Sequence, residues 1–208
     1  KGEIGASALM TPPFALIVQS EPLNKPALEA LANALIAKGW HLPGVNGIAE
    51  VSDCFAEIWQ EKTGQQARPI VNTRAYELRQ VNTLSYPPGG MKLADESDAQ
   101  IAADMHNAMI EEVVLGPRRL GTAESELESI RQKRTFFWVD GGDVVSIALA
   151  NRPQIKAICV GGVYTPPGFR RRGYARALVA EVSKELLSRG YELTNLFTDL
   201  SNPTSNKI

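Results

Sequence analysis

Apolar residues recur along the chain with two periods, one of three to four residues and one of two, which predict helices and strands respectively. Between Lys25 and Lys38, leucines lie on one helical face, with Pro26 near the start and Gly39 after the end, where helices favour these residue types. For the first part of the chain the pattern predicts a strand over 14–18, helices over 25–38 and 51–64, and a strand through Tyr76 and Leu78.

In the rest of the chain predicted helices and strands also alternate, but three successive predicted strands have no helix between them. The turn DGGD separates the first two apolar runs, and its glycines supply the positive φ angles of a tight hairpin. Gly161 and Gly162 interrupt the third run, which predicts a bulge or a close approach to the backbone. The predicted order is helices over 97–114 and 123–133, an antiparallel meander of TFFWV, VVSIALA and AICVGGVY, a helix over 173–188 and a strand over 191–198.

The segment SYPPGG, Ser85 to Gly90, has the proline and glycine content of a connector between two units. We therefore predict an N-terminal unit over residues 1–84 and a second unit over residues 89–208. Because helices and strands alternate in both, the predicted class is α/β or α+β, with a mixed sheet.

Composition and charge narrow the classes of partner. The 208 residues carry a formal net charge of -1, so no general attraction to nucleic acid or to an anionic membrane is expected. No uninterrupted apolar stretch of about 18 residues is present to span a bilayer. Cys54 and Cys159 are far apart and lack CxxC spacing, which favours reduced thiols in a cytoplasmic protein over a disulfide or a metal site.

The stretch VYTPPGFRRRGYARAL, Val163 to Leu178, joins the last strand of the meander to the next helix. The amides of a helix's first turn have no backbone partner and carry partial positive charge, so they attract anions. Cationic side chains oppose this dipole, and a bound phosphate group would explain Arg170, Arg171 and Arg172; the alternative is a solvated basic loop. The spacing matches neither GxxxxGK[ST] nor GxGxxG, which disfavours a P-loop and a dinucleotide fold.

Arg170, Gly173 and Ala175 form an R-x-x-G-x-A motif after a strand, and this motif resembles the acyl-CoA pyrophosphate loop of the GNAT acetyltransferase superfamily. The order of the predicted elements over 89–208 agrees with that family, and Asn202 followed by Ser205 resembles the start of its next helix. The resemblance implies a GNAT fold preceded by a smaller α/β unit. It also implies acetyl-CoA as co-substrate, without a metal.

In this family acetyl-CoA lies in a V-shaped gap, where the strand before the loop and the strand after its helix splay apart. Backbone groups at the strand end would pair with the pantetheine arm, loop amides would hold the pyrophosphate, and the side chains of Arg170 and Arg172 would screen its charge. Asn202 is expected near the pantetheine amides, or as a helix cap, and both roles can hold together. A small residue is common at the place of Arg171, so its side chain is expected to point outward. The implied contacts are Val163, Tyr164, Thr165, Arg170, Arg171, Arg172, Gly173, Tyr174, Ala175, Arg176 and Asn202.

The implied reaction is direct attack of a neutral amine on the thioester carbonyl, with an acid to protonate the leaving thiolate. The family usually supplies that proton from a tyrosine, whose place is the first residue beyond Ile208. The chain opens without a methionine and stops inside what reads as a helix, so we expect a fragment. The resemblance implies that the last strands of the fold are missing, and we assign no catalytic residue. The strand from Ala157 to Val163 contains no acidic residue, which favours proton removal through water.

The acceptor amine is left open, as a small molecule or a peptide. His41 and His106 are predicted on the surface. Glu124, Glu126 and Glu128 form either a solvated helix face or an attractive surface for a cationic amine. A homodimer is one assembly that the sequence allows.

The N-terminal unit contains no loop like RRRGYA and no catalytic constellation. We interpret it either as a degenerate copy of the second unit or as an unrelated cap, with preference for the copy. For the whole chain the predicted function is N-acetyl transfer, and the alternative is a CoA-binding regulatory or scaffold domain without turnover.

Overall fold

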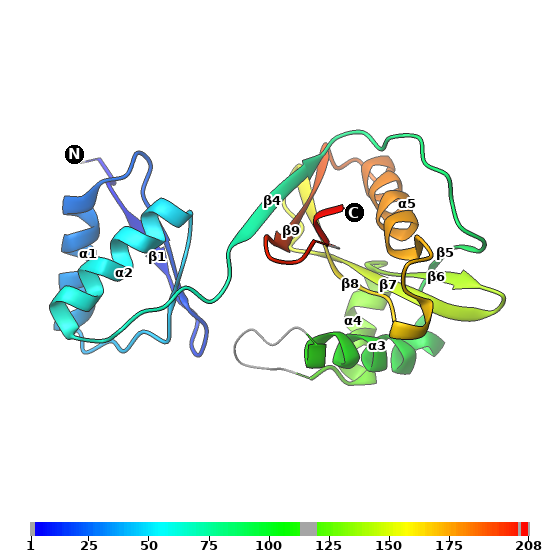
Figure 1. Cartoon of the computed structure of the whole chain (residues 1–208), viewed down its shortest axis with the longest axis horizontal. Coiled ribbons are helices and arrows are strands. Elements are labelled where there is room, and N and C mark those ends of the chain that lie inside the picture. The colour runs from blue at the N-terminus through cyan, green and yellow to red at the C-terminus, as the bar shows by residue number, and fades with distance from the viewer. Residues whose placement is uncertain (1–2, 113–119, 204, 208) are drawn as a thin grey trace. The chain divides into compact units, whose positions relative to one another are not determined.

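The computed structural model describes residues 3–112, 120–203 and 205–207, which belong to two compact units, Lys1–Asn72 and Thr73–Ile208 (Figure 1). The first unit has a three-stranded sheet of order β1-β2-β3, in which β2 pairs antiparallel with β1 and parallel with β3. Its core joins Leu16 and Val18 of the sheet to Leu28, Phe55 and Ile58 of the helices. Its elements are β1 (Ser7–Leu9), β2 (Leu16–Gln19), α1 (Lys25–Ala37), β3 (Val45–Asn46) and α2 (Ala49–Thr63).

Both predicted helices of this unit are present, and local signals set their ends. The Asn24 side chain accepts a 3.1 Å hydrogen bond from the amide of Ala27 at the start of α1. Gly64 ends α2 in the left-handed conformation, with φ of 74°. The strand predicted over 14–18 appears as β2, whereas the sequence pattern did not indicate β1 and β3, which are two to three residues long.

The second unit is built on a six-stranded mixed sheet of order β4-β9-β8-β7-β6-β5. The helix predicted over 97–114 is observed as η1 followed by α3, and its residues 113 and 114 lie outside the described residues. The elements are β4 (Thr73–Leu78), β5 (Gly90–Leu93), η1 (Glu96–Asp98), α3 (Ala99–Glu112), α4 (Ala123–Arg131), β6 (Thr135–Asp140), β7 (Asp143–Asn151), β8 (Ala157–Tyr164), η2 (Pro167–Phe169), α5 (Tyr174–Ser188), β9 (Leu193–Asp199) and η3 (Ser205–Lys207).

The boundary between the units differs from the one that the sequence pattern predicts. Strand β4 was assigned to the N-terminal unit over residues 1–84, but it pairs antiparallel with β9, from Thr73 opposite Asp199 to Leu78 opposite Thr194. The compact units therefore divide between Asn72 and Thr73. The partner strand lies more than a hundred residues further along the chain, so no local pattern indicates the pairing.

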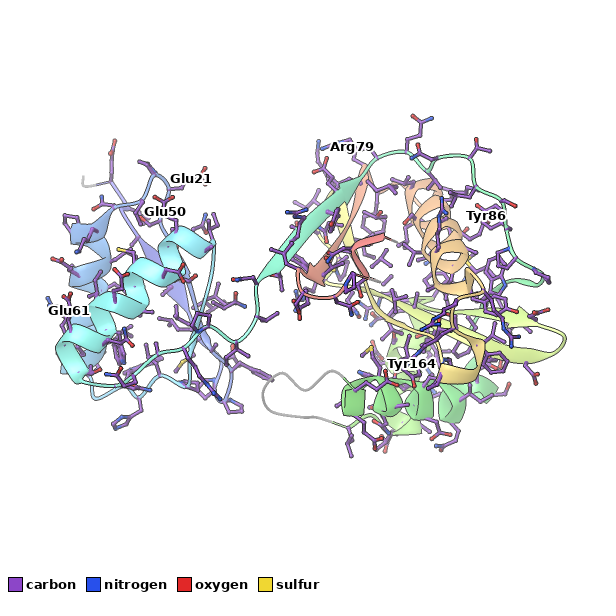
Figure 2. The ribbon with its side chains drawn as sticks, viewed as in Figure 1. Glu21, Glu50, Glu61, Arg79, Tyr86 and Tyr164 are labelled. Carbon is purple, nitrogen blue, oxygen red and sulfur yellow. The ribbon has the colours of Figure 1, made fainter. Side chains whose placement is uncertain are left out.

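The proline- and glycine-rich segment 85–90 also packs on the second unit. The ring of Tyr86 stacks on that of Trp138, with 6.0 Å between the centroids, and its hydroxyl accepts a 2.8 Å hydrogen bond from Lys184 Nζ (Figure 2). Trp138 Nε1 in turn donates a 2.9 Å hydrogen bond to the carbonyl of Pro88. These contacts hold the segment against α5 and β6, and β5 follows directly.

The two faces of the large sheet carry different helices (Figure 1). On one face Phe136, Val160 and other side chains of alternate positions pack against α5, and on the other Phe137 and Ile147 pack against α3 and α4. This division follows from the strand period of two, which sends successive side chains to opposite faces. Within the described part of the chain, no helix has both the length and the apolar character that crossing a membrane requires.

The sheet opens between its two parallel strands. Strand β8 pairs with β9 only from Ala157 opposite Leu193 to Cys159 opposite Asn195, whereas β9 continues to pair with β4 to its end. The rest of β8, from Val160 to Tyr164, has no register partner on β9. This is the splayed arrangement that the family resemblance implies.

Candidate functional site

The loop between β8 and α5 ends in two left-handed backbone positions. Arg171 has a φ of 64° and Gly173 a φ of 86°, and Gly173 is the N-cap of α5. The first helical hydrogen bond runs 3.0 Å from the amide of Ala177 to the carbonyl of Gly173, and no side chain caps this end. The amides of the three residues after Gly173 therefore have no acceptor within the helix, which is the condition for anion binding at a helix N-terminus.

The space in front of Gly173 is open. A Cβ atom built on Gly173 would meet no atom within 4 Å, so a group outside the chain can approach the backbone there. Because its φ is also positive, glycine is the residue that takes this conformation with least strain. The turn thus has both the shape and the free donors that the sequence motif predicts.

Two of the arginines in and after the loop, Arg170 and Arg172, make hydrogen bonds within the protein, and the other two make none to residues that the structure describes. Arg170 donates 2.7 Å hydrogen bonds to both carboxylate oxygens of Glu112 and a 2.9 Å bond from Nε to the carbonyl of Thr165. Arg172 donates to the carbonyl of Gly168 at 3.2 Å, and its guanidinium lies 5.8 Å from the ring centroid of Phe169. Both guanidinium groups thus hold the loop together, although the sequence analysis assigned them to screening of phosphate charge.

Arg171 and Arg176, in contrast to Arg170 and Arg172, do not bond to the loop residues that the structure describes. Within residues 3–112, 120–203 and 205–207, their guanidinium groups have no hydrogen bond or ion pair. Arg171 is exposed, as the sequence analysis expected from its bulk, and Arg176 lies in the first turn of α5. These two cations are therefore available to an anion at the helix end.

The side chain of Tyr174 points into the protein rather than toward the open turn. Tyr174 is only 3% exposed, and its hydroxyl donates a hydrogen bond to the carboxylate of Asp140 at the end of β6. This bond raises the pKa of the Tyr174 hydroxyl above its ordinary value, and desolvation adds to the shift. Tyr174 can therefore offer a ligand its backbone amide but not its hydroxyl.

A bulge lies in β8 where the sheet opens. Ile147 pairs with Tyr164, but Leu149 pairs with Gly161, so two residues of β8, Gly162 and Val163, lie opposite the single residue between them. Gly162 has a φ of 58°, and a Cβ atom there would lie 2.8 Å from Leu149 Cδ1. The bulge predicted from the paired glycines is confirmed.

The end of β8 is fixed by hydrogen bonds that the sequence did not indicate. The buried hydroxyl of Ser146 donates to the carbonyl of Tyr164 and lies within hydrogen-bond distance of Thr165 Oγ1, each at 2.9 Å. The Tyr164 carbonyl belongs to the segment Val163 to Thr165, which was expected to pair with a pantetheine arm. A carbonyl oxygen has two lone pairs, so one such bond leaves capacity for a second.

Two asparagines follow the splayed end of β9. Asn202 Oδ1 accepts a 3.2 Å hydrogen bond from the amide of Ser205, which matches the capping role considered from the sequence. Asn206, which the sequence analysis missed, donates to the carbonyls of Asp199, Leu200 and Asn202 at 2.8 to 3.2 Å. Asn206 thereby fixes the backbone after β9.

Asn195 lies at the point where β8 and β9 part. It is the last residue of β9 with a register partner on β8, and its side-chain Oδ1 is buried without a hydrogen-bond donor. Strand alternation puts Asn195 on the face opposite Thr194, whose hydroxyl contacts Ser183 of α5. A buried acceptor without a donor is costly, and it lies where the sheet begins to open.

Glu112 at the end of α3 is a further residue of the site that the sequence did not indicate. Its carboxylate accepts the two hydrogen bonds from Arg170 and a 3.2 Å bond from the hydroxyl of Tyr164, whose ring lies 5.7 Å from the Arg170 guanidinium (Figure 2). Burial raises the pKa of the Tyr164 hydroxyl, and the bond to Glu112 raises it further. The partners are more than fifty residues apart, so no spacing rule could have found them.

The prediction that His106 is a surface residue holds only in part, because its side chain is half-buried. Its Nδ1 lies 2.9 Å from Glu126 Oε1, and the two side chains are 27% and 7% exposed. Glu126 therefore lies in the interface of α3 with α4 and is buried. Of the three glutamates over 124–128, only Glu124 and Glu128 are exposed to solvent. The sequence did not indicate the pairing of His106 with Glu126, because it joins two helices and the periodicity of a single helix does not report it.

Metal ligands do not cluster in the part of the chain that the structure describes. No group of three or more histidine, cysteine, aspartate and glutamate side chains lies close enough together there to hold a metal ion.

Comparison with solved structures finds the same fold at low identity. A GCN5-related N-acetyltransferase from Sphaerobacter thermophilus is 18% identical, with a TM-score of 0.62 over 93% of this chain and 67% of that chain. A GNAT-family acetyltransferase from Colwellia psychrerythraea is 14% identical, with a TM-score of 0.60 over 91% and 69%. An N-acetyltransferase from Staphylococcus aureus Mu50 is 20% identical, with a TM-score of 0.51 over 57% and 78%.

Sequence comparison identifies the family. No curated protein is similar enough to match the chain. The sequence model of the acetyltransferase (GNAT) family matches residues 103–207, which is half of the 208 residues. The chain therefore belongs to the acetyltransferase (GNAT) family.

Proposed function

We propose that this protein transfers an acetyl group from acetyl-CoA to a primary amine. The observation that carries the proposal is the open N-terminal turn of α5, where Gly173 leaves free amides and open space beside the splayed ends of β8 and β9. Membership in the acetyltransferase family supports acetyl-CoA as the substrate.

In this proposal the amides of residues 171–176 hold the pyrophosphate of CoA, and Arg171 and Arg176 supply the screening charge. Arg170 and Arg172 act indirectly, by fixing the shape of the loop, since their guanidinium groups are already bound to Glu112 and to the carbonyl of Gly168. The pantetheine arm would lie along residues 163–165 of β8, in the manner of an added strand. Asn202 would lie near its amides.

The reaction would proceed by direct transfer. The nitrogen of the neutral amine attacks the thioester carbonyl carbon, the C–N bond forms, the C–S bond breaks, and the thiolate of CoA leaves and takes up a proton. Water would remove the amine proton, because β8 carries no acidic side chain from Ala157 to Tyr164. The acceptor is a small-molecule or peptide amine.

Two free cysteines, Cys54 and the buried Cys159, agree with the proposed cytoplasmic location, where thiols stay reduced. Burial raises the pKa of the Cys159 thiol, which makes it a poor nucleophile. A thiol of this kind supports direct transfer to the amine over a covalent acetyl-cysteine intermediate.

A thiol-release assay tests the proposal. Acetyl-CoA is mixed with the protein and a panel of amines that includes polyamines, amino acids, aminoglycosides and N-terminal peptides, and free CoA is followed with a thiol reagent. The proposal predicts amine-dependent release for at least one class. Tight CoA binding without release across the panel would instead support a CoA-binding module without turnover.

A further inference from the structure

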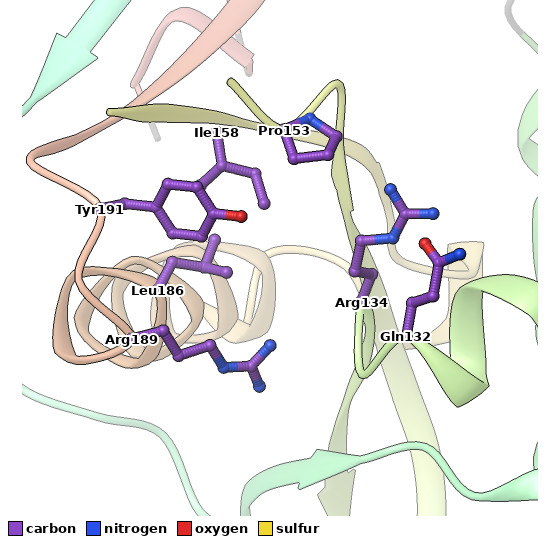
Figure 3. Close-up of a pocket in the computed structure, with 7 residues that line it drawn as sticks. All are labelled: Gln132, Arg134, Pro153, Ile158, Leu186, Arg189 and Tyr191. Carbon is purple, nitrogen blue, oxygen red and sulfur yellow. The ribbon is translucent and has the colours of Figure 1, made fainter. Parts of the chain in front are cut away.

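A second hollow lies at the other end of α5, away from Gly173. It has a volume of 340 Å³ and is bounded by the last turn of α5, the start of β6, the start of β8 and the end of α4 (Figure 3). Helix α5 has 15 residues, so its two ends are about 20 Å apart at 1.5 Å per residue. This α5 C-terminal hollow, lined by Gln132, Arg134, Ile158, Leu186, Arg189 and Tyr191 among others, is therefore separate from the proposed CoA turn.

Arg134 is the reason to expect a ligand in this hollow. Among the described residues its guanidinium group makes no hydrogen bond, and of its three nitrogens only Nε is fully buried. No ion pair to Arg134 occurs among the described residues either. The terminal nitrogens of Arg134 are therefore available to an acceptor in the hollow, and a charge-assisted hydrogen bond there would stabilise the protein.

Arg189 adds a fixed second cation. Its Nε donates a 2.9 Å hydrogen bond to Glu185, one terminal nitrogen donates to the carbonyl of Lys133, and the guanidinium lies 5.3 Å from the ring centroid of Phe136. Glu185 offsets the charge of Arg189, whereas Arg134 has no ion pair with a carboxylate among the described residues. Because Arg189 is held on several sides, its guanidinium group is preorganised.

The negative end of the α5 dipole does not cancel this positive character. The carbonyls of Leu186 and Leu187 accept hydrogen bonds of 3.2 Å and 3.1 Å from the amides of Arg189 and Gly190. The last turn is therefore capped by its own backbone. The dipole acts only within that turn and is smaller than a full guanidinium charge.

The remaining lining groups are mostly donors or apolar. The hydroxyl of Tyr191 has no hydrogen bond among the described residues, and it points toward the same space as the two arginines (Figure 3). No lining residue is acidic, and the side-chain amide of Gln132 already donates to Glu128. Pro153 and the ring of Tyr191 provide apolar surface, whereas Ile158 and Leu186 are only 2% and 0% exposed.

We infer that the α5 C-terminal hollow binds a small carboxylate that carries a compact apolar body. A carboxylate supplies acceptors for Arg134 and for the Tyr191 hydroxyl, and it matches the planar guanidinium group. The apolar body fits against Pro153 and the ring of Tyr191. This inference does not depend on the acetyl-transfer proposal, because it concerns other residues and a different ligand.

Benzoate is a suitable probe. We expect benzoate, titrated into the ¹⁵N-labelled protein, to shift the amide signals of residues around Leu186 and Tyr191 in a saturable way. Saturating CoA should leave this titration unchanged. Arg134→Gln should weaken benzoate binding about tenfold or more, the size of one charge-assisted hydrogen bond, and Tyr191→Phe should weaken it several-fold.

The matched control is Arg131→Gln. Arg131 lies three residues before Arg134, but its side chain pairs with Glu96 and does not line the hollow, so benzoate affinity should not change. Benzyl alcohol, which has the same ring without the charge, should bind much more weakly. The inference is overturned if benzoate causes no saturable shift, if Arg134→Gln binds it as well as the wild type does, or if inorganic phosphate binds more tightly than benzoate.

Discussion

Glu112 connects the end of α3 to the loop that precedes α5, and it does so through both carboxylate oxygens. Arg170 is also bonded to the carbonyl of Thr165, so one carboxylate positions the loop relative to the end of β8. Arg170 thus links α3 to the end of β8, and we expect its loss to make the turn with the free amides less well ordered.

Glu112→Gln tests this role. The variant keeps the size of the side chain but removes the charge that holds Arg170, so the Michaelis constant for acetyl-CoA should rise about threefold to tenfold while kcat changes less. The effect is modest because the ion pair is partly exposed, at 42% and 44% of the two side chains. The Kd of CoA from calorimetry should rise by the same factor.

Glu111→Gln is the control for that experiment, because Glu111 is exposed and has no partner among the described residues. An equal effect of both substitutions would show that general surface charge, and not the tie to Arg170, determines CoA affinity. A double-mutant cycle of Glu112→Gln with Tyr164→Phe should show coupling, since the two side chains share a hydrogen bond.

Tyr174 predicts a pH dependence of stability. Its hydrogen bond to Asp140 raises its pKa in the folded state, so above the ordinary tyrosine pKa of about 10 the unfolded chain loses the proton first. The free energy of unfolding should therefore fall as the pH rises from about 9 to 11. Urea denaturation should show a smaller fall for Tyr174→Phe, and equal falls in the two proteins would contradict the assigned hydrogen bond.

At the residue scale, the sequence predicts the turn but not the groups that support it. Arg171, Gly173 and the following amides lie within a few residues of one another, so local backbone rules are enough to predict their arrangement. Glu112 and Arg170 are 58 residues apart, and the buried oxygen of Asn195 depends on where two strands separate. Such contacts depend on the assembled fold.

At the scale of elements, Gly162 is the position where the bulge of β8 requires glycine. Gly162→Ala puts a Cβ atom 2.8 Å from Leu149 Cδ1 at a φ of 58°, so we expect a loss of roughly 1–3 kcal/mol in the free energy of unfolding. Urea denaturation at neutral pH measures this loss.

Gly161→Ala is the matched substitution one residue earlier. Its φ is not positive, and the nearest atom to a new Cβ, Asn151 Nδ2, would be 3.7 Å away, which is an ordinary contact. Its effect should be within about 0.5 kcal/mol of zero. If Gly161→Ala and Gly162→Ala lowered the free energy of unfolding equally, the backbone conformation of the bulge would not explain the loss in Gly162→Ala.

The helices were predicted from sequence more completely than the strands. The spans of α1, α2, α4 and α5 agree with the predicted ones to within about two residues, because helical periodicity and caps are local. The four-residue β5 was missed, since GMKL shows no clear alternation, and β4 was given to the wrong unit. Pairing partners of strands are set by tertiary contacts that single segments do not encode.

At the scale of the whole molecule, each unit has a hydrophobic core of its own. Leu28, Phe55 and Ile58 belong to the first, whereas the cores on either side of the large sheet contain only residues of the second. We propose that the first unit is a divergent half that has lost the ligand loop, in keeping with its lack of a sequence like RRRGYA.

The position of the division can be tested with two shortened chains. A chain that starts at Thr73 keeps β4 against β9, and we expect it to unfold cooperatively with nearly the stability of the second unit in the full chain. A chain that starts at Ser85 lacks β4, exposes the edge of β9 and should be clearly less stable in urea. If the urea unfolding midpoints of the two chains were equal, β4 would not belong to the second unit, and the boundary would lie in the segment 85–90 as the sequence pattern predicts.

The central claim is that the free amides after Gly173 bind the pyrophosphate of CoA, and calorimetric titration of CoA tests it directly. We expect Gly173→Glu to weaken binding by a factor of about one hundred or more, because it adds a negative charge in the open space before the helix. Gly173→Ala shares the backbone strain without the charge and should weaken binding much less. Gly190→Glu makes the same change at a positive φ beyond the other end of α5 and should leave affinity unchanged. Wild-type affinity in Gly173→Glu would contradict the claim.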